Sequence, residues 1–114
     1  MNTKQAQALI KEFCKQRDWD QFHDPKELAI GMSTEANELL SLFRFLDKQQ
    51  TLEALTNKRE LIEDELMDVL FFVLRFAQRY DVNIEEAFMR KMASNDEKYP
   101  VDLVKGKNKK YNEY

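Results

Sequence analysis

The chain reads LIEDELMDVLFFVL from Leu61 to Leu74, the most apolar part of the sequence that also contains acidic side chains. The residues that share one helical face follow at steps of four, three and four, and they are Leu61, Glu65, Asp68 and Phe72. The uninterrupted apolar run from Val69 to Leu74 is six residues long, far short of a membrane span. The stretch therefore predicts a buried α-helix that carries two acidic side chains between apolar neighbours.

A second helical stripe occurs earlier in the chain and also contains an acidic pair. Its members are Leu28, Met32, Glu35, Leu39, Leu42 and Leu46, with Glu38 one turn after Glu35. Residues 27–43 and 60–74 contain no Lys or Arg, so salt bridges within these helices cannot neutralise the acids. Because an unpaired buried carboxylate costs several kcal/mol, the sequence predicts that a partner from elsewhere neutralises both pairs.

The two acidic pairs, Glu35 with Glu38 and Glu65 with Asp68, suit a divalent cation. Two helices lying side by side would bring the carboxylates together, and carboxylate oxygens without thiolates or imidazoles suit Mg²⁺ or Mn²⁺ better than Zn²⁺. A ferritin-like di-iron site would need His at position 68, where the chain has Asp. The sequence therefore predicts a magnesium site formed by these residues, with Mn²⁺ as an alternative ion.

Composition places the chain among small helical proteins. Its 114 residues suffice for one domain with a core, and two Gly and two Pro are too few for the turns of a sheet protein. The net charge of −3 argues against a nucleic-acid polymer as partner. No secretory leader or membrane span is recognisable and one cysteine cannot form an internal disulfide, so we expect a cytoplasmic protein without a membrane partner. We expect Cys14 to pack as a small apolar side chain.

Helix-start signals divide the chain into four predicted helices. The first covers about residues 3–17, and the others begin after the caps Asp24, Asn57 and Asn83 and end near residues 47, 80 and 99. Pro25 stands at the first position of the second helix. These helices predict an all-α four-helix bundle in a single domain, residues 1–114, with residues 100–114 as an extended tail. Because the second and third helices are apolar nearly all round, we also expect a homo-oligomer, most simply a two-fold dimer.

An acidic cluster that holds metal ions fits a nucleoside triphosphate as ligand, because the ions neutralise phosphate charge and activate water. Lys91 and Asn95, spaced i,i+4, are candidates to bind this ligand, and the alternative is an exposed Lys and a helix-ending Asn. Trp19 and His23 delimit a loop that offers an aromatic face and a hydrogen-bonding group to a base, and the alternative is a core Trp and a surface His. Gly31, one turn before Glu35, is expected to permit close approach of a neighbour.

The motifs together resemble a known family. The pairs Glu35-x-x-Glu38 and Glu65-x-x-Asp68, about thirty residues apart, are similar to the signature of the MazG-like, all-α nucleoside triphosphate pyrophosphohydrolase superfamily. Further motifs resemble its dCTP pyrophosphatase branch, and they are RDWDQFHDP at 17–25, KMASNDEKYPV at 91–101 and KYNEY at 110–114. The resemblance covers nearly the whole chain.

The resemblance implies hydrolysis of a deoxynucleoside triphosphate, dCTP or a modified form, to the monophosphate and pyrophosphate by attack of water on the α-phosphorus. It implies that the metal-binding and catalytic residues are Glu35, Glu38, Glu65 and Asp68. It implies that the residues that bind the substrate are Trp19, Asp20, Gln21, Phe22, His23, Phe45, Phe72, Lys91 and Asn95. It also implies a homo-oligomer, either a dimer or a tetramer.

The chain departs from the family pattern at three places. Thr34 stands where the superfamily often has Glu before the first metal ligand, and Ile10 stands where some relatives have His. Phe45 and Phe72 stand where Trp and Tyr are common near the base, so the aromatic faces are kept and the indole N–H and phenol O–H are lost. We expect these changes to preserve the chemistry and to leave the base preference open.

Two other classes of function fit the same residues. A non-catalytic helical module would bind a nucleotide or dock a partner helix without releasing product. A pure oligomerisation module would become more stable when all the acids are neutralised, even with Mg²⁺ present.

Overall fold

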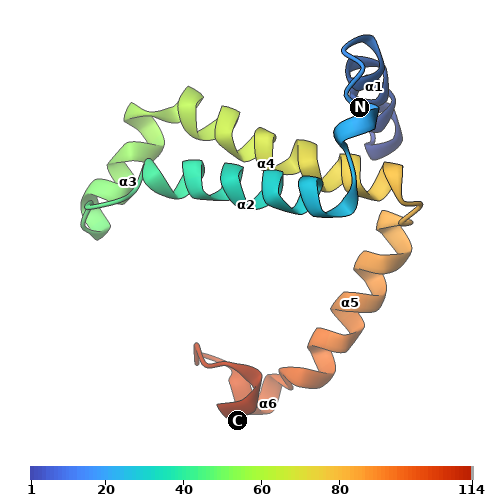
Figure 1. Ribbon diagram of the computed structural model, residues 1–114. Coiled ribbons are helices and arrows are strands. Elements are labelled where there is room, and N and C mark those ends of the chain that lie inside the picture. The colour runs from blue at the N-terminus through green and yellow to red at the C-terminus, as the bar shows by residue number, and fades with distance from the viewer. Residues whose placement is uncertain (114) are drawn as a thin grey trace. The chain divides into compact units, whose positions relative to one another are not determined.

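The computed structural model describes residues 1–113, and these residues form helices joined by turns, without any strand. The elements in order are α1 (Thr3–Gln16), η1 (Asp20–Phe22), α2 (Pro25–Ser41), α3 (Lys48–Asn57), α4 (Arg59–Arg79), α5 (Ile84–Lys98), α6 (Val101–Val104) and η2 (Tyr111–Glu113) (Figure 1). The prediction of an all-α fold is confirmed. The chain divides into two compact units, Met1–Asp81 and Val82–Tyr114. A single domain over residues 1–114 stays a prediction.

The first unit is organised around the antiparallel pair α2 and α4, which lie side by side along most of their length (Figure 1). The predicted cap of α2 is confirmed, because the Asp24 carboxylate accepts a 2.7 Å hydrogen bond from the backbone N–H of Glu27 and Pro25 is the first helical residue. The pairing of the two helices places both acidic stripes of the sequence against each other.

The connection between α2 and α4 corrects the sequence-based prediction. We expected one helix to continue to residue 47, but α2 ends at Ser41 and a separate helix, α3, follows. Phe45 in this turn has φ of 67°, a left-handed conformation that ends a helix and that a bulky residue adopts at some cost. Asp47 and Gln50 then form a capping box, in which each side chain bonds the backbone N–H of the other residue.

Two further boundaries differ from the prediction. Asn57 is the last residue of α3 rather than the cap of α4, and the cap position of α4 is Lys58, whose side chain makes no capping bond. The segment 100–114, expected as an extended tail, contains α6 and η2. Residues 1–113 thus contain six α-helices instead of four, while assembly as a bundle and an oligomer stays a prediction. The cap at Asn83 is confirmed by a 3.0 Å bond from the N–H of Glu86.

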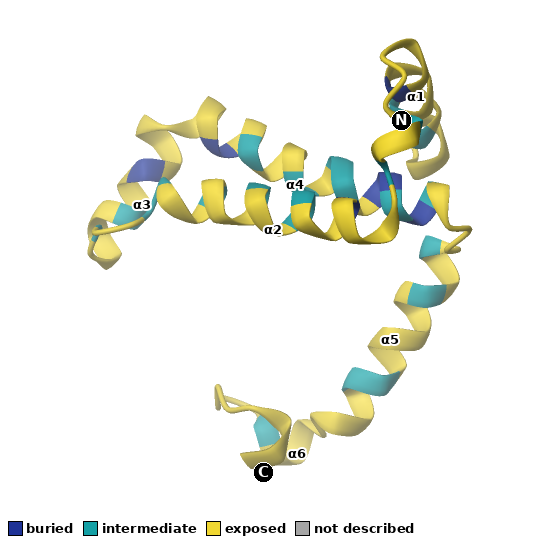
Figure 2. Ribbon diagram, viewed as in Figure 1, coloured by how far each residue is buried: buried dark blue, intermediate teal, exposed yellow. Residues whose placement is uncertain are grey.

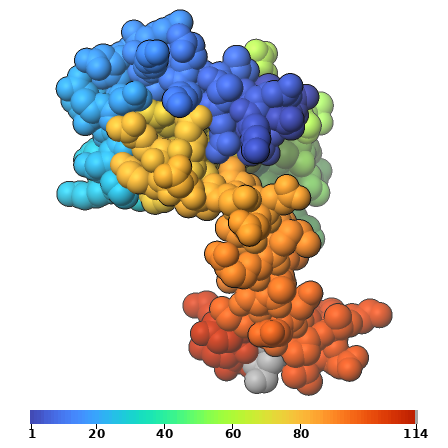
Figure 3. All heavy atoms as spheres, turned by 90° about the vertical axis from the view of Figure 1, so that its right-hand side faces the viewer, coloured from blue at the N-terminus to red at the C-terminus, as the bar shows by residue number. Residues whose placement is uncertain are grey.

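The core of the first unit lies between α4 and its neighbours. Helix α1 contacts the C-terminal part of α4, where the Gln7 amide donates to the carbonyl of Leu74 at 3.0 Å and the Gln78 amide donates to the carbonyl of Gln7 at 2.6 Å. The space-filling view shows α1 and the segment after it around this end of α4 (Figure 3). Cys14 is fully buried as expected, and burial raises the pKa of its thiol. The other buried apolar residues are Leu28, Ala54, Ile62, Leu74 and Ala77.

Many large apolar side chains remain exposed in the first unit (Figure 2). On α4 the exposed fractions are 48% for Leu66, 51% for Met67, 41% for Leu70 and 41% for Val73. This exposed apolar surface supports the expectation of a homo-oligomer.

Within residues 1–113, no helix combines the length and the apolar character needed to cross a membrane.

Candidate functional site

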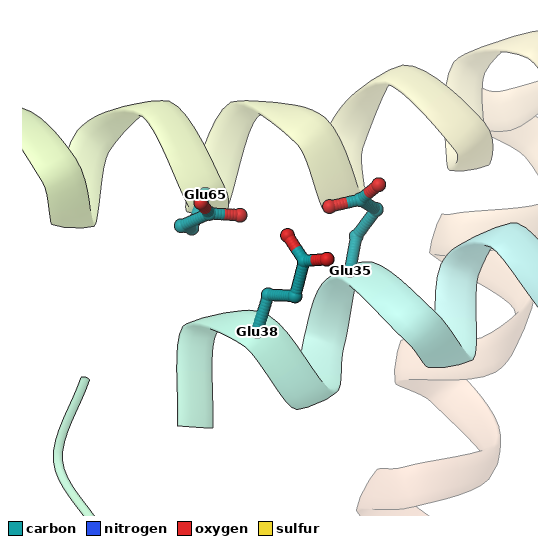
Figure 4. Close-up of side chains that lie close together, drawn as sticks. All are labelled: Glu35, Glu38 and Glu65. Carbon is teal, nitrogen blue, oxygen red and sulfur yellow. The ribbon is translucent and has the colours of Figure 1, made fainter. Parts of the chain in front are cut away.

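A cluster of carboxylates lies between α2 and α4. Glu35 and Glu38 project from α2, Glu65 projects from α4, and all point toward the space between the two helices (Figure 4). One oxygen from each of these carboxylates lies within 4.8 Å of the others. The helical spacing of Glu35 and Glu38 places both on one face of α2, and the antiparallel pairing brings Glu65 opposite them.

Two oxygens of this cluster are buried without a partner. Oε2 of Glu35 and Oε2 of Glu65 are shielded from solvent and accept no hydrogen bond. The ion pairs of Arg59 with Glu63 and of Arg75 with Asp20 lie elsewhere and do not neutralise the cluster. Buried acceptors are normally satisfied, so these oxygens mark a place where a cationic ligand is expected.

The pKa values of Glu35 and Glu65 are both raised above the ordinary value for glutamate. For Glu35 the main cause is desolvation, followed by the negative charges of Glu38 and Asp68. For Glu65 the causes are desolvation, and then the charge of Glu38. Half-buried acids that repel one another in this way favour either protons or a bound cation.

Asp68, the fourth predicted ligand, is placed differently from the other acids. It is exposed, one helical turn after Glu65, and is not part of the group whose oxygens lie within 4.8 Å of one another. Its charge still contributes to the raised pKa values of Glu35 and Glu65. Glu38 is also exposed, so the expectation that neither acidic pair faces solvent was right for Glu35 and Glu65 only.

The α2–α4 contact next to the cluster depends on a glycine. A Cβ atom at position 31 would lie 2.6 Å from Cδ1 and Cζ of the Phe72 ring, closer than real Cβ contacts. The prediction that Gly31 permits close approach is therefore confirmed, and the neighbour is Phe72, one of the predicted substrate-binding residues. Its ring is half-buried against α2.

The predicted binding loop is held by a buried arginine. Arg75 of α4 is 2% exposed, its Nε donates to Nδ1 of His23 at 3.0 Å, and its Nη2 pairs with the Asp20 carboxylate. The backbone of the loop is also anchored, because Arg79 donates to the carbonyl of Asp20 at 3.0 Å and the Tyr80 hydroxyl donates to the carbonyl of His23 at 2.7 Å. The structure thus brings the loop and the C-terminal end of α4 together.

The other residues of the loop have different surroundings. Trp19 is 39% exposed, and its ring packs edge-to-face on Phe13 with its centroid 6.3 Å from that of the His23 ring. The Gln21 amide bonds the Asp18 carboxylate at 2.9 Å within the loop itself. Phe22 is 61% exposed. The alternative of a core Trp and a surface His does not describe these positions, because Trp19 is exposed and His23 is half-buried.

The remaining predicted binding residues lie on other elements. Phe45 is 88% exposed in the turn after α2, with the Arg44 guanidinium over its ring. Lys91 and Asn95 lie on α5 in the second unit, Lys91 exposed and Asn95 half-buried. Asn95 is inside the helix rather than at its end. Tyr114 of the motif at 110–114 falls outside the described residues.

Arg75 is the important residue of this region that the sequence analysis missed. It lies 52 residues from His23 and 55 from Asp20 along the chain, so its contacts have no local pattern. The available signal was a lone basic residue directly after the apolar run from Val69 to Leu74. A charge at a position that packing should bury calls for a buried partner.

Comparison with known proteins assigns the family. The MazG-like family model matches residues 30–114, which include both acidic pairs and Phe72. The chain belongs to the MazG-like family.

Several relatives in this family have names that state an activity. The chain is 37% identical over 105 residues to dCTP pyrophosphatase 1 of Mus musculus, covering 90% of this chain and 62% of that protein. It is 34% identical over 107 residues to dCTP pyrophosphatase 1 of Homo sapiens, covering 92% of this chain and 63% of that protein. The chain therefore spans less than two thirds of the length of these curated relatives.

A solved structure supports the fold. The crystal structure of a pyrophosphatase from Archaeoglobus fulgidus superposes with a TM-score of 0.82 at 34% identity, covering 85% of this chain and 91% of that chain. A likeness of this extent confirms the MazG-like fold.

Proposed function

We propose that this MazG-like chain is a nucleoside triphosphate pyrophosphohydrolase that uses Mg²⁺, with Mn²⁺ as a possible substitute, and acts on a deoxynucleoside triphosphate, dCTP or a modified dCTP. The observation that carries the proposal is the cluster of Glu35, Glu38 and Glu65, in which two buried oxygens lack partners. The names of the relatives and of the structural neighbour support the same reaction.

The residues of the cluster fit a hard divalent cation. All the ligand atoms offered are carboxylate oxygens, the group that Mg²⁺ prefers, and the orphaned oxygens of Glu35 and Glu65 would gain a partner. Asp68, one helical turn after Glu65, stays a predicted fourth ligand. When bound, the metal would neutralise phosphate charge and polarise the α-phosphorus and a water molecule.

In the proposed reaction, a water oxygen forms a bond to the α-phosphorus while the bond from that phosphorus to the α,β-bridging oxygen breaks. The leaving group is pyrophosphate, and the monophosphate remains with one water oxygen. Glu35, Glu38 and Glu65 would hold the metal at the reacting groups, and the proton that water loses would pass to bulk solvent.

The nucleoside would be held by residues of the first unit. In the proposal Trp19 and Phe72 offer aromatic faces to the base, and His23 offers a hydrogen bond, from the loop that Arg75 anchors. Lys91 and Asn95, spaced i,i+4 on α5, stay predicted contacts of the phosphates. The remaining predicted contacts are Asp20, Gln21, Phe22 and Phe45.

The proposal is tested by product analysis. Each dNTP and NTP is incubated with Mg²⁺, with Mn²⁺ and with EDTA, and monophosphate is separated from diphosphate. Monophosphate with pyrophosphate, abolished by EDTA, is expected, and Glu38→Gln should lower kcat by at least about a hundredfold. Glu60→Gln, an exposed acid in the first turn of α4, is the control and should keep the wild-type rate.

Diphosphate and inorganic phosphate as products would contradict cleavage at the α-phosphorus. Binding without any product would favour the alternative of a non-catalytic nucleotide-binding or helical interaction module. In that case Glu38→Gln would change the affinity for the nucleotide and no rate would exist to lose.

A further inference from the structure

The environment of His23 is unusual because its ring nitrogen Nδ1 faces a buried cation. Nε of Arg75 donates to Nδ1 at 3.0 Å, and an arginine nitrogen is always protonated and never accepts. Nδ1 must therefore be the unprotonated nitrogen. Turning the ring over would place a C–H group against the Arg75 N–H and leave that buried donor without a partner, so the hydrogen-bond network fixes the ring orientation.

Arg75 is itself held rigidly by several contacts. Its Nη2 pairs with the Asp20 carboxylate, and its Nη1 donates to Oε1 of Gln78 at 3.0 Å. The Gln78 amide in turn donates to the carbonyl of Gln7 at 2.6 Å. The guanidinium is thus fixed by the loop and by Gln78 of α4, which is itself bonded to α1. These bonds hold the Arg75 N–H in its direction toward the His23 ring. A network of this kind preorganises the His23 imidazole, which is its last member.

We propose that Arg75 is a positioning residue that fixes the neutral imidazole of His23 with its proton on Nε2, so that the loop presents a single hydrogen-bond donor to an acceptor atom of the bound nucleotide. The inference rests on the proposed function in one respect only, namely that the loop from Trp19 to His23 contacts the nucleotide. It assigns Arg75 a role that the sequence motifs did not indicate.

The charges around His23 also favour the neutral form of its imidazole. The pKa of His23 is lowered by burial and by the positive charge of Arg75, while the carboxylate of Asp20 opposes this and Arg79 adds to it. The imidazole is therefore neutral near pH 7. A neutral ring with one proton can only donate from one nitrogen, and Nδ1 is already occupied as an acceptor.

The first test reads the tautomer directly. Because His23 is the only histidine, a ¹⁵N-histidine-labelled protein gives a single imidazole spectrum in NMR. We expect two-bond correlations of the tautomer with the proton on Nε2 at pH 7 in the free wild-type protein. A proton on Nδ1, or a doubly protonated ring, would overturn the proposal without any variant and without any activity measurement.

The second test separates Arg75 from its neighbour Arg79. Arg75→Lys keeps a charge to pair with Asp20 but loses the planar fork that reaches both side chains. We expect a mixture of tautomers and a KM for the nucleotide raised about tenfold, with kcat within about twofold of wild type, since one charge-assisted bond is lost. Arg79→Gln removes a bond to the backbone of the same loop and should leave the tautomer unchanged.

An unchanged tautomer and an unchanged KM in folded Arg75→Lys would refute the role of Arg75. Circular dichroism and thermal melting show whether the variant is folded. If it is unfolded, the tautomer in the wild-type NMR spectrum is the test of the proposal. Failure of the proposed function is a separate result, because the tautomer of the free protein is measured whether or not any nucleotide is hydrolysed.

The source of the acceptor is resolved by ligand addition. Deoxycytidine and inorganic pyrophosphate are added separately, the latter with Mg²⁺. A shift of the Nε2 resonance with deoxycytidine assigns the acceptor to the base or sugar, and a shift with pyrophosphate assigns it to the phosphates. No shift with either ligand would contradict the donor role of His23.

Discussion

Replacing Gly31 by alanine tests the close contact of α2 with Phe72. A Cβ at position 31 would lie 2.6 Å from Cδ1 of the Phe72 ring, whereas carbon atoms in ordinary contact are about 3.5–4.0 Å apart. The ring would have to recede by about 1 Å, and such overpacking costs about 1–3 kcal/mol. In a helix, alanine is itself about 1 kcal/mol more favourable than glycine. The net expectation for Gly31→Ala is a loss of about 0–2 kcal/mol in the free energy of unfolding.

The decisive measurement is a double-mutant cycle in urea denaturation. With the ring removed by Phe72→Ala, the same Gly31→Ala change should stabilise the protein by about 1 kcal/mol, because only helix propensity remains. The coupling energy between the two positions is then about 1–3 kcal/mol. Equal stabilisation by Gly31→Ala in both backgrounds would refute the contact and, with it, the placement of the Phe72 ring beside α2.

Two further predictions concern the stability of the first unit. Because the folded-state pKa of Glu35 is raised, the stability of the metal-free protein should fall as pH rises through that pKa. In EDTA at pH 7, Glu35→Gln should therefore melt at a higher temperature than wild type, and it should lose the stabilisation by Mg²⁺. A lower melting temperature of Glu35→Gln in EDTA would contradict the repulsion between the carboxylates. Leu28 is fully buried, so Leu28→Ala should cost about 2–5 kcal/mol, while Leu52→Ala, at a side chain that is 59% exposed, should cost less than about 1 kcal/mol by urea denaturation; equal losses would disprove this difference in burial.

Local signals in the sequence predicted the two helices that form the site. Asp24 with Pro25 defined the start of α2, and the helical stripe that contains Glu35 correctly indicated a half-buried acid. These features are set by neighbours within one or two helical turns, which is the range over which side-chain caps and helical faces act.

The errors arose where a local signal was overlooked or where none existed. The segment between α2 and α3 contains no Gly or Pro, and the residue with positive φ is Phe45. The available cue was the capping box of Asp47 and Gln50. The contacts of Arg75 with Asp20 and His23 join residues more than fifty positions apart, and only the packing of the loop on α4 reveals them. The sequence also gave no means of separating exposed Asp68 from half-buried Glu65 on the same stripe.

The position of Trp19 gives this molecule a built-in optical probe. It is the single tryptophan of the chain, and it lies on the loop with 39% of its surface exposed, edge-to-face with Phe13 and 6.3 Å from the imidazole of His23. Indole emission depends on solvent access and on nearby quenching groups, so its wavelength and intensity report on this one loop alone. Ligand titrations and stopped-flow experiments can therefore follow the loop in the unlabelled protein when the indole is excited at wavelengths that the four tyrosines do not absorb.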